Sequence, residues 1–199
     1  MVRISLGIDL PATPLSPAGV GEPVALYVGG YSHRPNEDAA LRLERSIMPL
    51  VRRRLPNVRL LLVGATPSDA MRAAAGEADT ITGEVPSVEP YLDQAALVVL
   101  PIRIGGGMRV KLLEALAAGK AVVASPLAAA GLELTSGQQI VLADTDDEFA
   151  KAIVDLLADH AAREQLGRNA RSWAVAHLSW ESRVTQYERL YRSLLSADQ

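Results

Sequence analysis

Apolar residues occur in short runs along this chain, and the segments between the runs carry apolar positions three and four residues apart. The segment after the first run shows this helical spacing at Ala40, Leu43, Ile47 and Val51. Strands separated by such helices form a parallel sheet with helices on both faces, so the pattern predicts a three-layer α/β/α sandwich with a mostly parallel sheet. The predicted strands are residues 24–28, 58–63, 80–82, 97–100, 121–124 and 139–142.

Local signals set the ends of several predicted helices. Asn36 is a favourable N-cap for the first helix, and Pro49 predicts a kink or a division later in the same helix. The last helix has an apolar face that we expect to lie mostly in the core, with a partner surface as the less favoured interpretation. That face consists of Trp180, Tyr187, Leu190, Tyr191 and Leu194. The remaining predicted helices are residues 68–75, 88–94, 146–158, 161–177 and 179–195.

Residues 1–23 show little apolar periodicity and contain four prolines. This composition predicts an extended linker or inter-domain connection rather than a folded element. Residues 24–199 are long enough for a full core and are expected to form one domain with trailing helices. A chain that opens with a linker is expected to be the second part of something longer.

The strand at 97–100 leads into a stretch suited to binding an anion. Pro101 ends the apolar run, three consecutive glycines follow at 105–107, and strong helix formers begin just after them. Without side chains, the loop allows backbone N–H groups at the helix start to approach an anion closely. Arg109 and Lys111 are unfavourable beside the positive end of the helix dipole unless a bound anion offsets them, so we expect a phosphate-bearing ligand.

Glu114 follows within the same predicted helix. Its neighbours Leu112, Leu113 and Leu116 are apolar, which is typical of a buried helix, and a buried carboxylate needs a partner. The simpler interpretation is an ion pair with Lys111, three residues earlier. We favour the alternative, in which Glu114 accepts hydrogen bonds from the hydroxyl groups of the ligand whose phosphates occupy the glycine loop.

Composition excludes several other classes of site. A net charge of −3 argues against the usual basic surface for nucleic acid, so an anion site has to be local. The chain has no cysteine, and its three histidines lack the spacing of metal ligands, so no metal site is predicted. No apolar stretch has the length of a membrane span, and the N-terminus lacks a hydrophobic signal core. We therefore expect a cytoplasmic protein, at most peripheral to a membrane.

Other classes of protein with this architecture fit the sequence poorly. A dinucleotide-binding GxGxxG loop would need glycine or alanine at Val110. A phosphate-binding P-loop would place glycine before Lys111 and serine or threonine after it. A signalling receiver domain would have acidic residues after the first strand, where this chain has Gly29 and Gly30.

The run from Gly105 to Ala124 resembles the donor-binding signature of group 1 glycosyltransferases with the GT-B fold. The similarity covers about residues 24–195 and implies a Rossmann-like domain, the C-terminal half of a GT-B enzyme. Residues 4–15 resemble the inter-domain crossover of that family, whose N-terminal domain holds the acceptor. The other matching segments are residues 28–30, 35–39, 62–64, 82–85 and 178–180.

The resemblance implies a role for each candidate residue. Arg109 and Lys111 would neutralise the departing nucleoside diphosphate, which is electrostatic catalysis without a metal. Glu114 would bind the ribose, and the acidic residue that many members carry eight positions earlier is replaced by Gly106. The implied donor-binding residues are Gly29, Gly30, Val85, Gly105, Gly106, Gly107, Met108 and Glu114.

The expected function is therefore donor binding for glycosyl transfer. The donor would be a UDP- or GDP-sugar, used as substrate without a cofactor, and the acceptor would be a glycan, lipid or small molecule held by the N-terminal domain. The isolated chain is expected to bind the nucleotide but to transfer no sugar. The alternative is a non-catalytic nucleotide-sugar-binding module or a nucleotide-sugar epimerase of the same architecture.

Overall fold

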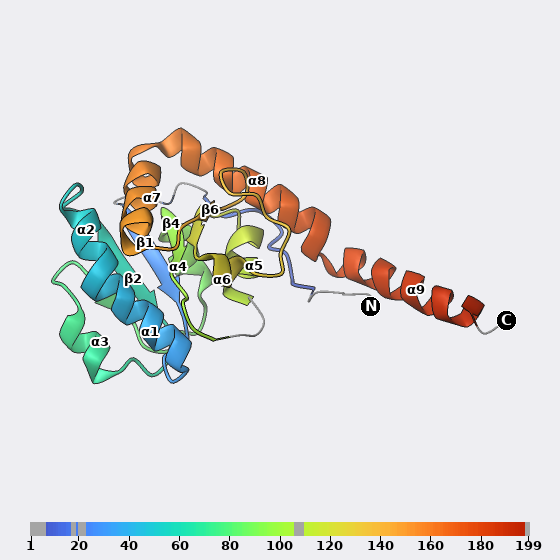
Figure 1. Cartoon of the computed structure of the whole chain (residues 1–199), viewed down its shortest axis with the longest axis horizontal. Coiled ribbons are helices and arrows are strands. Elements are labelled where there is room, and N and C mark those ends of the chain that lie inside the picture. Colours follow the sequence, from blue (N-terminus) through green and yellow to red (C-terminus); the bar gives the residue numbers. More distant parts are fainter. Residues whose placement is uncertain (1–6, 17–18, 20–22, 106–109, 198–199) are drawn as a thin grey trace.

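The computed structural model describes residues 7–16, 19, 23–105 and 110–197. Six strands form one sheet in the order β3-β2-β1-β4-β5-β6, and every neighbouring pair is parallel (Figure 1). The predicted parallel α/β architecture is confirmed, with strand ends within two residues of the prediction. The strands are β1 (Val24–Val28), β2 (Arg59–Val63), β3 (Thr80–Ile81), β4 (Leu97–Leu100), β5 (Val122–Ala124) and β6 (Val141–Leu142).

The helices form two layers around the sheet (Figure 1). In one layer, α7 packs on α2 and contacts β4 and β5, while α1 packs on α3; in the other, α4 lies on β1, α5 lies on β5, and α8 covers α5. The helical elements are α1 (Arg34–Arg42), the π-helical η1 (Leu43–Ile47), α2 (Met48–Arg52), α3 (Asp69–Ala74), α4 (Glu89–Gln94), α5 (Val110–Ala117), α6 (Pro126–Ala129), α7 (Asp146–Ala158), α8 (His160–Leu178) and α9 (Trp180–Ala197).

The start of α1 differs from the prediction. His33, not Asn36, is the N-cap residue, and Pro35 lies in the first turn, where its fixed φ favours the helix and its missing N–H is not needed. Asn36 is therefore inside the helix with its side chain turned inward. The predicted division near Pro49 is confirmed as a π-helical turn, in which the N–H of Met48 donates to the carbonyl of Leu43.

The N-terminal segment is extended and attached to the second helical layer. The N–H of Ile8 donates to the carbonyl of Leu178 at 2.9 Å, and the N–H of Leu15 donates to the carbonyl of Ala118 at 3.0 Å. Arg171 donates to the carbonyl of Pro11 at 2.6 Å. These bonds hold the segment against α5 and α8.

The helix α9 extends away from the rest of the molecule (Figure 1). Trp180 is 47% exposed, and Tyr187, Tyr191 and Leu194 are also exposed. The prediction that this apolar face lies mostly in the core is wrong, because α9 packs against α8 and has no further major packing partner in the described part of the chain. Among the described residues, no helix combines the length and the apolar character needed to cross a membrane.

Candidate functional site

The strands β1 and β4 are neighbours at the centre of the sheet, and the chain leaves them in opposite directions. From β1 it continues to β2 on one side, and from β4 it continues to β5 on the other. In open parallel sheets this reversal opens a crevice at the carboxyl ends of the two strands, where ligands bind. The loops that follow β1 and β4 are therefore expected to form the binding site.

A hollow of about 100 Å³ lies between these two loops. One side comes from the start of α1, another from β4 and the loop that follows it, and a third from the start of α5. Its lining combines apolar side chains with one imidazole, one amide and one ammonium group. The lining residues are His33, Pro35, Asn36, Leu100, Ile102, Ile104, Gly105, Lys111, Leu112 and Ala128.

Lys111 provides the positive charge of this hollow. Its Nζ donates to Oδ1 of Asn36 at 3.0 Å, and the side chain is half-buried. Burial lowers the pKa of Lys111, and the nearby charge of Glu114 acts in the opposite direction. Within the described ranges no carboxylate forms an ion pair with Lys111. The simpler alternative, an ion pair with Glu114, is therefore not made, and the ammonium group is available to an anionic ligand.

Asn36 connects Lys111 to β1 and to the loop that follows it. Its Nδ2 donates to the carbonyl of Gly30 at 2.8 Å, and its Oδ1 accepts from the hydroxyl of Tyr27 at 3.2 Å. This role was not predicted, because the local pattern of residues assigned Asn36 to a helix cap. The signal that could have revealed it is Pro35, because a proline favours the first helical turn and so moves the cap position earlier.

Two glycines allow Asn36 and Pro35 to pack closely against the backbone beside the hollow. A Cβ on Gly29 would lie 3.1 Å from Cβ and Cγ of Asn36, and a Cβ on Gly105 would lie 2.8 Å from Cγ of Pro35. Gly105 also has φ +97°, a conformation that side chains disfavour. Gly30 has open space where a Cβ would lie, and its carbonyl accepts the hydrogen bond from Nδ2 of Asn36. The predicted site residues Gly106, Gly107, Met108 and Arg109 lie outside the described residues.

Glu114 occupies a different surface from Lys111. The expectation that it is buried is wrong, because α5 turns its apolar residues inward and leaves Glu114 exposed. It lines a second hollow of about 200 Å³ with Val88 of the β3–α4 loop and Pro11 of the N-terminal segment. Although the residue is exposed as a whole, desolvation of its carboxyl raises the pKa of Glu114, and the nearby charge of Lys111 acts in the opposite direction. Val85 is half-buried against the core and lines neither hollow.

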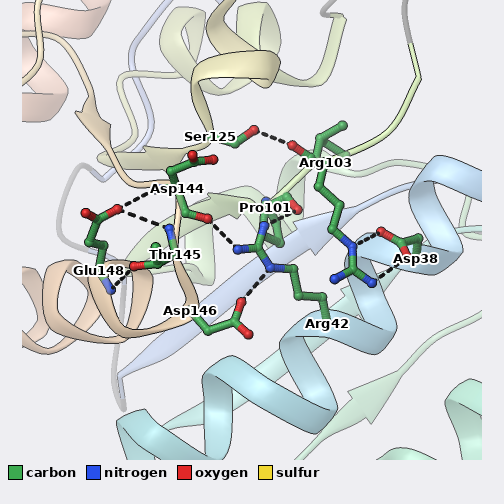
Figure 2. Close-up of polar contacts among 10 residues, drawn as sticks. Asp38, Arg42, Pro101, Arg103, Ser125, Asp144, Thr145, Asp146 and Glu148 are labelled. Atoms are coloured by element: carbon green, nitrogen blue, oxygen red, sulfur yellow. Dashed lines mark hydrogen bonds and ion pairs between the residues drawn. The ribbon is translucent and has the colours of Figure 1, made fainter.

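Buried polar contacts hold the loop after β4 in place (Figure 2). Arg42 donates to the carbonyl of Pro101 at 3.1 Å and pairs with Asp146 at 2.6 Å. Ser125 donates to the carbonyl of Ile102 at 2.5 Å. These contacts join α1, α6 and the start of α7 to the wall of the first hollow, so the wall has a fixed position.

The chemistry of the first hollow suits an oxyanion. It offers an ammonium group at the beginning of a helix, where the helix dipole also favours negative charge. The described residues contain no group of three or more histidine, aspartate or glutamate side chains able to hold a metal ion.

Comparisons of the sequence identify relatives. Residues 22–159 match the family model described as glycosyl transferases group 1. The phosphatidyl-myo-inositol mannosyltransferase of Mycolicibacterium smegmatis is 29% identical over 208 residues, which is 98% of this chain and 53% of that protein. A GDP-mannose-dependent alpha-(1-6)-phosphatidylinositol monomannoside mannosyltransferase of the same organism is 29% identical over 86% of this chain and 48% of its own length. The chain thus spans about half the length of these curated relatives.

Solved structures share the fold. The sucrose-phosphate synthase of Thermosynechococcus elongatus is similar with a TM-score of 0.70 and 26% identity, over 88% of this chain and 46% of that one. HepE of Anabaena, solved with UDP and glucose, has a TM-score of 0.69 and 17% identity, over 87% of this chain and 48% of that one. The architecture is that of GT-B glycosyltransferases. The family model matches more than half of the residues of this chain, and the chain therefore belongs to the group 1 glycosyl transferases.

Proposed function

We propose that this chain is the donor-binding part of a nucleotide-sugar-dependent glycosyltransferase, and that the hollow between β1 and β4 takes the diphosphate of the donor. The observation that carries the proposal is the Lys111 ammonium group, which lies at the central crevice without a carboxylate partner among the described residues. A bound diphosphate would supply the missing negative charge. Arg109 and the backbone of Gly105–Met108 would complete this site, as the resemblance implies.

The positions of Lys111 and Glu114 support a ligand that extends over α5. The two residues line different hollows, yet side chains three residues apart on a helix lie only about 5–6 Å from each other at Cβ. A nucleoside diphosphate is long enough to place its phosphates beside Lys111 and its ribose beside Glu114. Val88, which lines the second hollow, would then contact the base, and Val85, three residues earlier in the chain, would do so only as the resemblance implies.

The chemistry expected from this arrangement is stabilisation of the leaving group. As the bond from sugar to phosphate breaks, negative charge grows on the nucleoside diphosphate, and a fixed cation lowers the energy of that state. The names of relatives indicate which nucleotides to test, since one is GDP-mannose-dependent and one structure contains UDP. We propose a GDP- or UDP-sugar donor and no cofactor.

Transfer to an acceptor would require more than this chain. It spans about half the length of its curated relatives, and in the proposed arrangement an N-terminal domain holds the acceptor, which would be a glycan, a lipid or a small molecule. The full-length enzyme would act in the cytoplasm or at a membrane surface. We therefore expect the isolated 199-residue chain to bind the nucleotide and to transfer no sugar.

Titration calorimetry with GDP, UDP, ADP and CDP tests the proposal. The parent chain should bind GDP or UDP, and Lys111→Ala and Glu114→Ala should each weaken binding by about 1–3 kcal/mol, the range for a lost hydrogen bond to a charged group. Lys151→Ala is the matched control, because Lys151 is exposed on α7, pairs with Asp155 and lines neither hollow. Unchanged affinity in both site variants would show that the site has been misplaced.

A further inference from the structure

Lys111 carries its charge on a long side chain. A flexible ammonium group loses conformational freedom when it binds a ligand, and holding it in place beforehand reduces that loss. The structure provides such a hold, since Nζ of Lys111 lies 3.0 Å from Oδ1 of Asn36.

The Asn36 amide has only one orientation that satisfies its neighbours. Lys111 can only donate and the carbonyl of Gly30 can only accept, so Oδ1 faces Lys111 and Nδ2 faces Gly30. The Tyr27 hydroxyl donates to the same Oδ1. Burial raises the pKa of Tyr27 well above its ordinary value, which keeps the hydroxyl protonated and able to donate.

Packing leaves Asn36 little room to move. Asn36 is only 7% exposed, and its partner Tyr27 is fully buried. The missing side chain of Gly29 provides the space that Asn36 occupies. Three elements, β1, the β1–α1 loop and α1, thus fix one amide group, whose oxygen accepts from Lys111.

We propose that Asn36, oriented by Tyr27 and Gly30, is a positioning residue that holds the Lys111 ammonium group at the edge of the hollow for the diphosphate of the donor. This role rests on the proposed function. A neutral amide oxygen fixes the ammonium group without cancelling its charge, whereas a carboxylate in the same place would neutralise it and repel the diphosphate. Asparagine is therefore the chemically appropriate residue at this position.

A double-mutant cycle in GDP and UDP titrations separates positioning from mere structural support. Lys111→Ala should weaken binding about fivefold to 150-fold, and Asn36→Ala about threefold to thirtyfold. In the Lys111→Ala background, Asn36→Ala should change the affinity less than about twofold, because it then has no ammonium group to hold. Equal effects of Asn36→Ala in both backgrounds would overturn the proposal.

Further variants keep the test open if Asn36→Ala fails to fold. Tyr27→Phe removes one bond to Oδ1 and should weaken binding only when Lys111 is present. Asn36→Asp should weaken binding although it strengthens the contact with Lys111. Asn169→Ala is the matched control, because Asn169 also donates from Nδ2 to a backbone carbonyl but lies on α8, and it should leave affinity unchanged.

A second measurement distinguishes failure of this proposal from failure of the proposed function. The chain has three lysines, so the pKa of Lys111 can be followed by NMR of the lysine Cε signals and assigned with Lys111→Ala. Asn36→Ala should lower that pKa and Asn36→Asp should raise it. If the parent binds no nucleotide, the proposed function fails, while these shifts would still support the contact between Asn36 and Lys111. An unchanged pKa of Lys111 in both variants would overturn the positioning role of Asn36.

Discussion

Single residues in this molecule show how strongly burial changes the behaviour of a charged group. Arg42 is almost fully buried, yet it pairs with Asp146, donates to two carbonyls and lies 5.1 Å from the centre of the Phe149 ring. Glu44 is equally buried at 4% exposed, but neither of its carboxylate oxygens has a hydrogen-bond partner. The two residues are therefore buried in different ways: Arg42 has a network of polar partners, whereas burial without such partners favours the neutral form of Glu44.

Glu44 should make the stability of the fold depend on pH. Burial first, and then the nearby Asp79 carboxylate, raises the pKa of Glu44 from 4.5 to about 8, with Arg52 acting in the opposite direction. Between those values the folded state keeps a proton that the unfolded chain releases. The contribution of Glu44 is therefore complete below pH 4.5 and is lost as the pH rises to about 8, at no more than about 1.4 kcal/mol for each pH unit.

Urea unfolding at a series of pH values checks this expectation. Glu44→Gln keeps the shape of the neutral side chain and should flatten the decline between pH 5 and pH 8, after other titrating groups are accounted for by comparison with the parent. Glu188→Gln, an exposed pair member on α9, should leave the decline as it is. A parent and a Glu44→Gln variant with the same slope would contradict the assignment.

At the scale of elements, α7 shows how a local sequence sets a helix boundary. Thr145 accepts from the N–H of Glu148, and the Glu148 carboxylate accepts from the N–H of Thr145, so each satisfies a backbone group of the other. The pKa of Glu148 is lowered, chiefly by its backbone hydrogen bonds from Asp144 and Thr145. The predicted and observed bounds of this helix coincide because the signal lies within four residues.

Thr145→Ala should lower the free energy of unfolding by about 1 kcal/mol, because the N–H of Glu148 loses its acceptor. Thr145→Ser keeps the hydroxyl and should restore most of the loss. Thermal and urea unfolding followed by circular dichroism measure both variants. A Thr145→Ala protein as stable as the parent would indicate that solvent replaces the cap at no cost.

At the scale of the whole molecule, the long helix α9 is the feature least like the rest. Leu195 is 73% exposed, and Val184, Tyr187, Tyr191 and Leu194 are exposed on the same element. A contiguous apolar surface of this kind is unusual in a monomer and promotes association.

We expect the 199-residue chain to self-associate as its concentration rises. The double substitution Leu194→Ser and Leu195→Ser should reduce the association without changing the melting temperature, since both residues are exposed. Arg192→Ser, a substitution of an exposed polar residue on the same helix, should have little effect. Sedimentation velocity over a range of concentrations measures the self-association. A parent chain that stays monomeric throughout would contradict the expectation.

The local pattern of residues determined the parallel sheet and the order of strands and helices along the chain, because strand runs, helical spacing and turn residues act over short distances. Only the tertiary structure decided how those pieces face one another. It turned Asn36 inward toward Tyr27 and Lys111, it exposed Glu114 and the apolar face of α9, and it separated Lys111 and Glu114 into two hollows. The physical reason is that burial and hydrogen-bond partners depend on residues distant in sequence, which no local pattern contains.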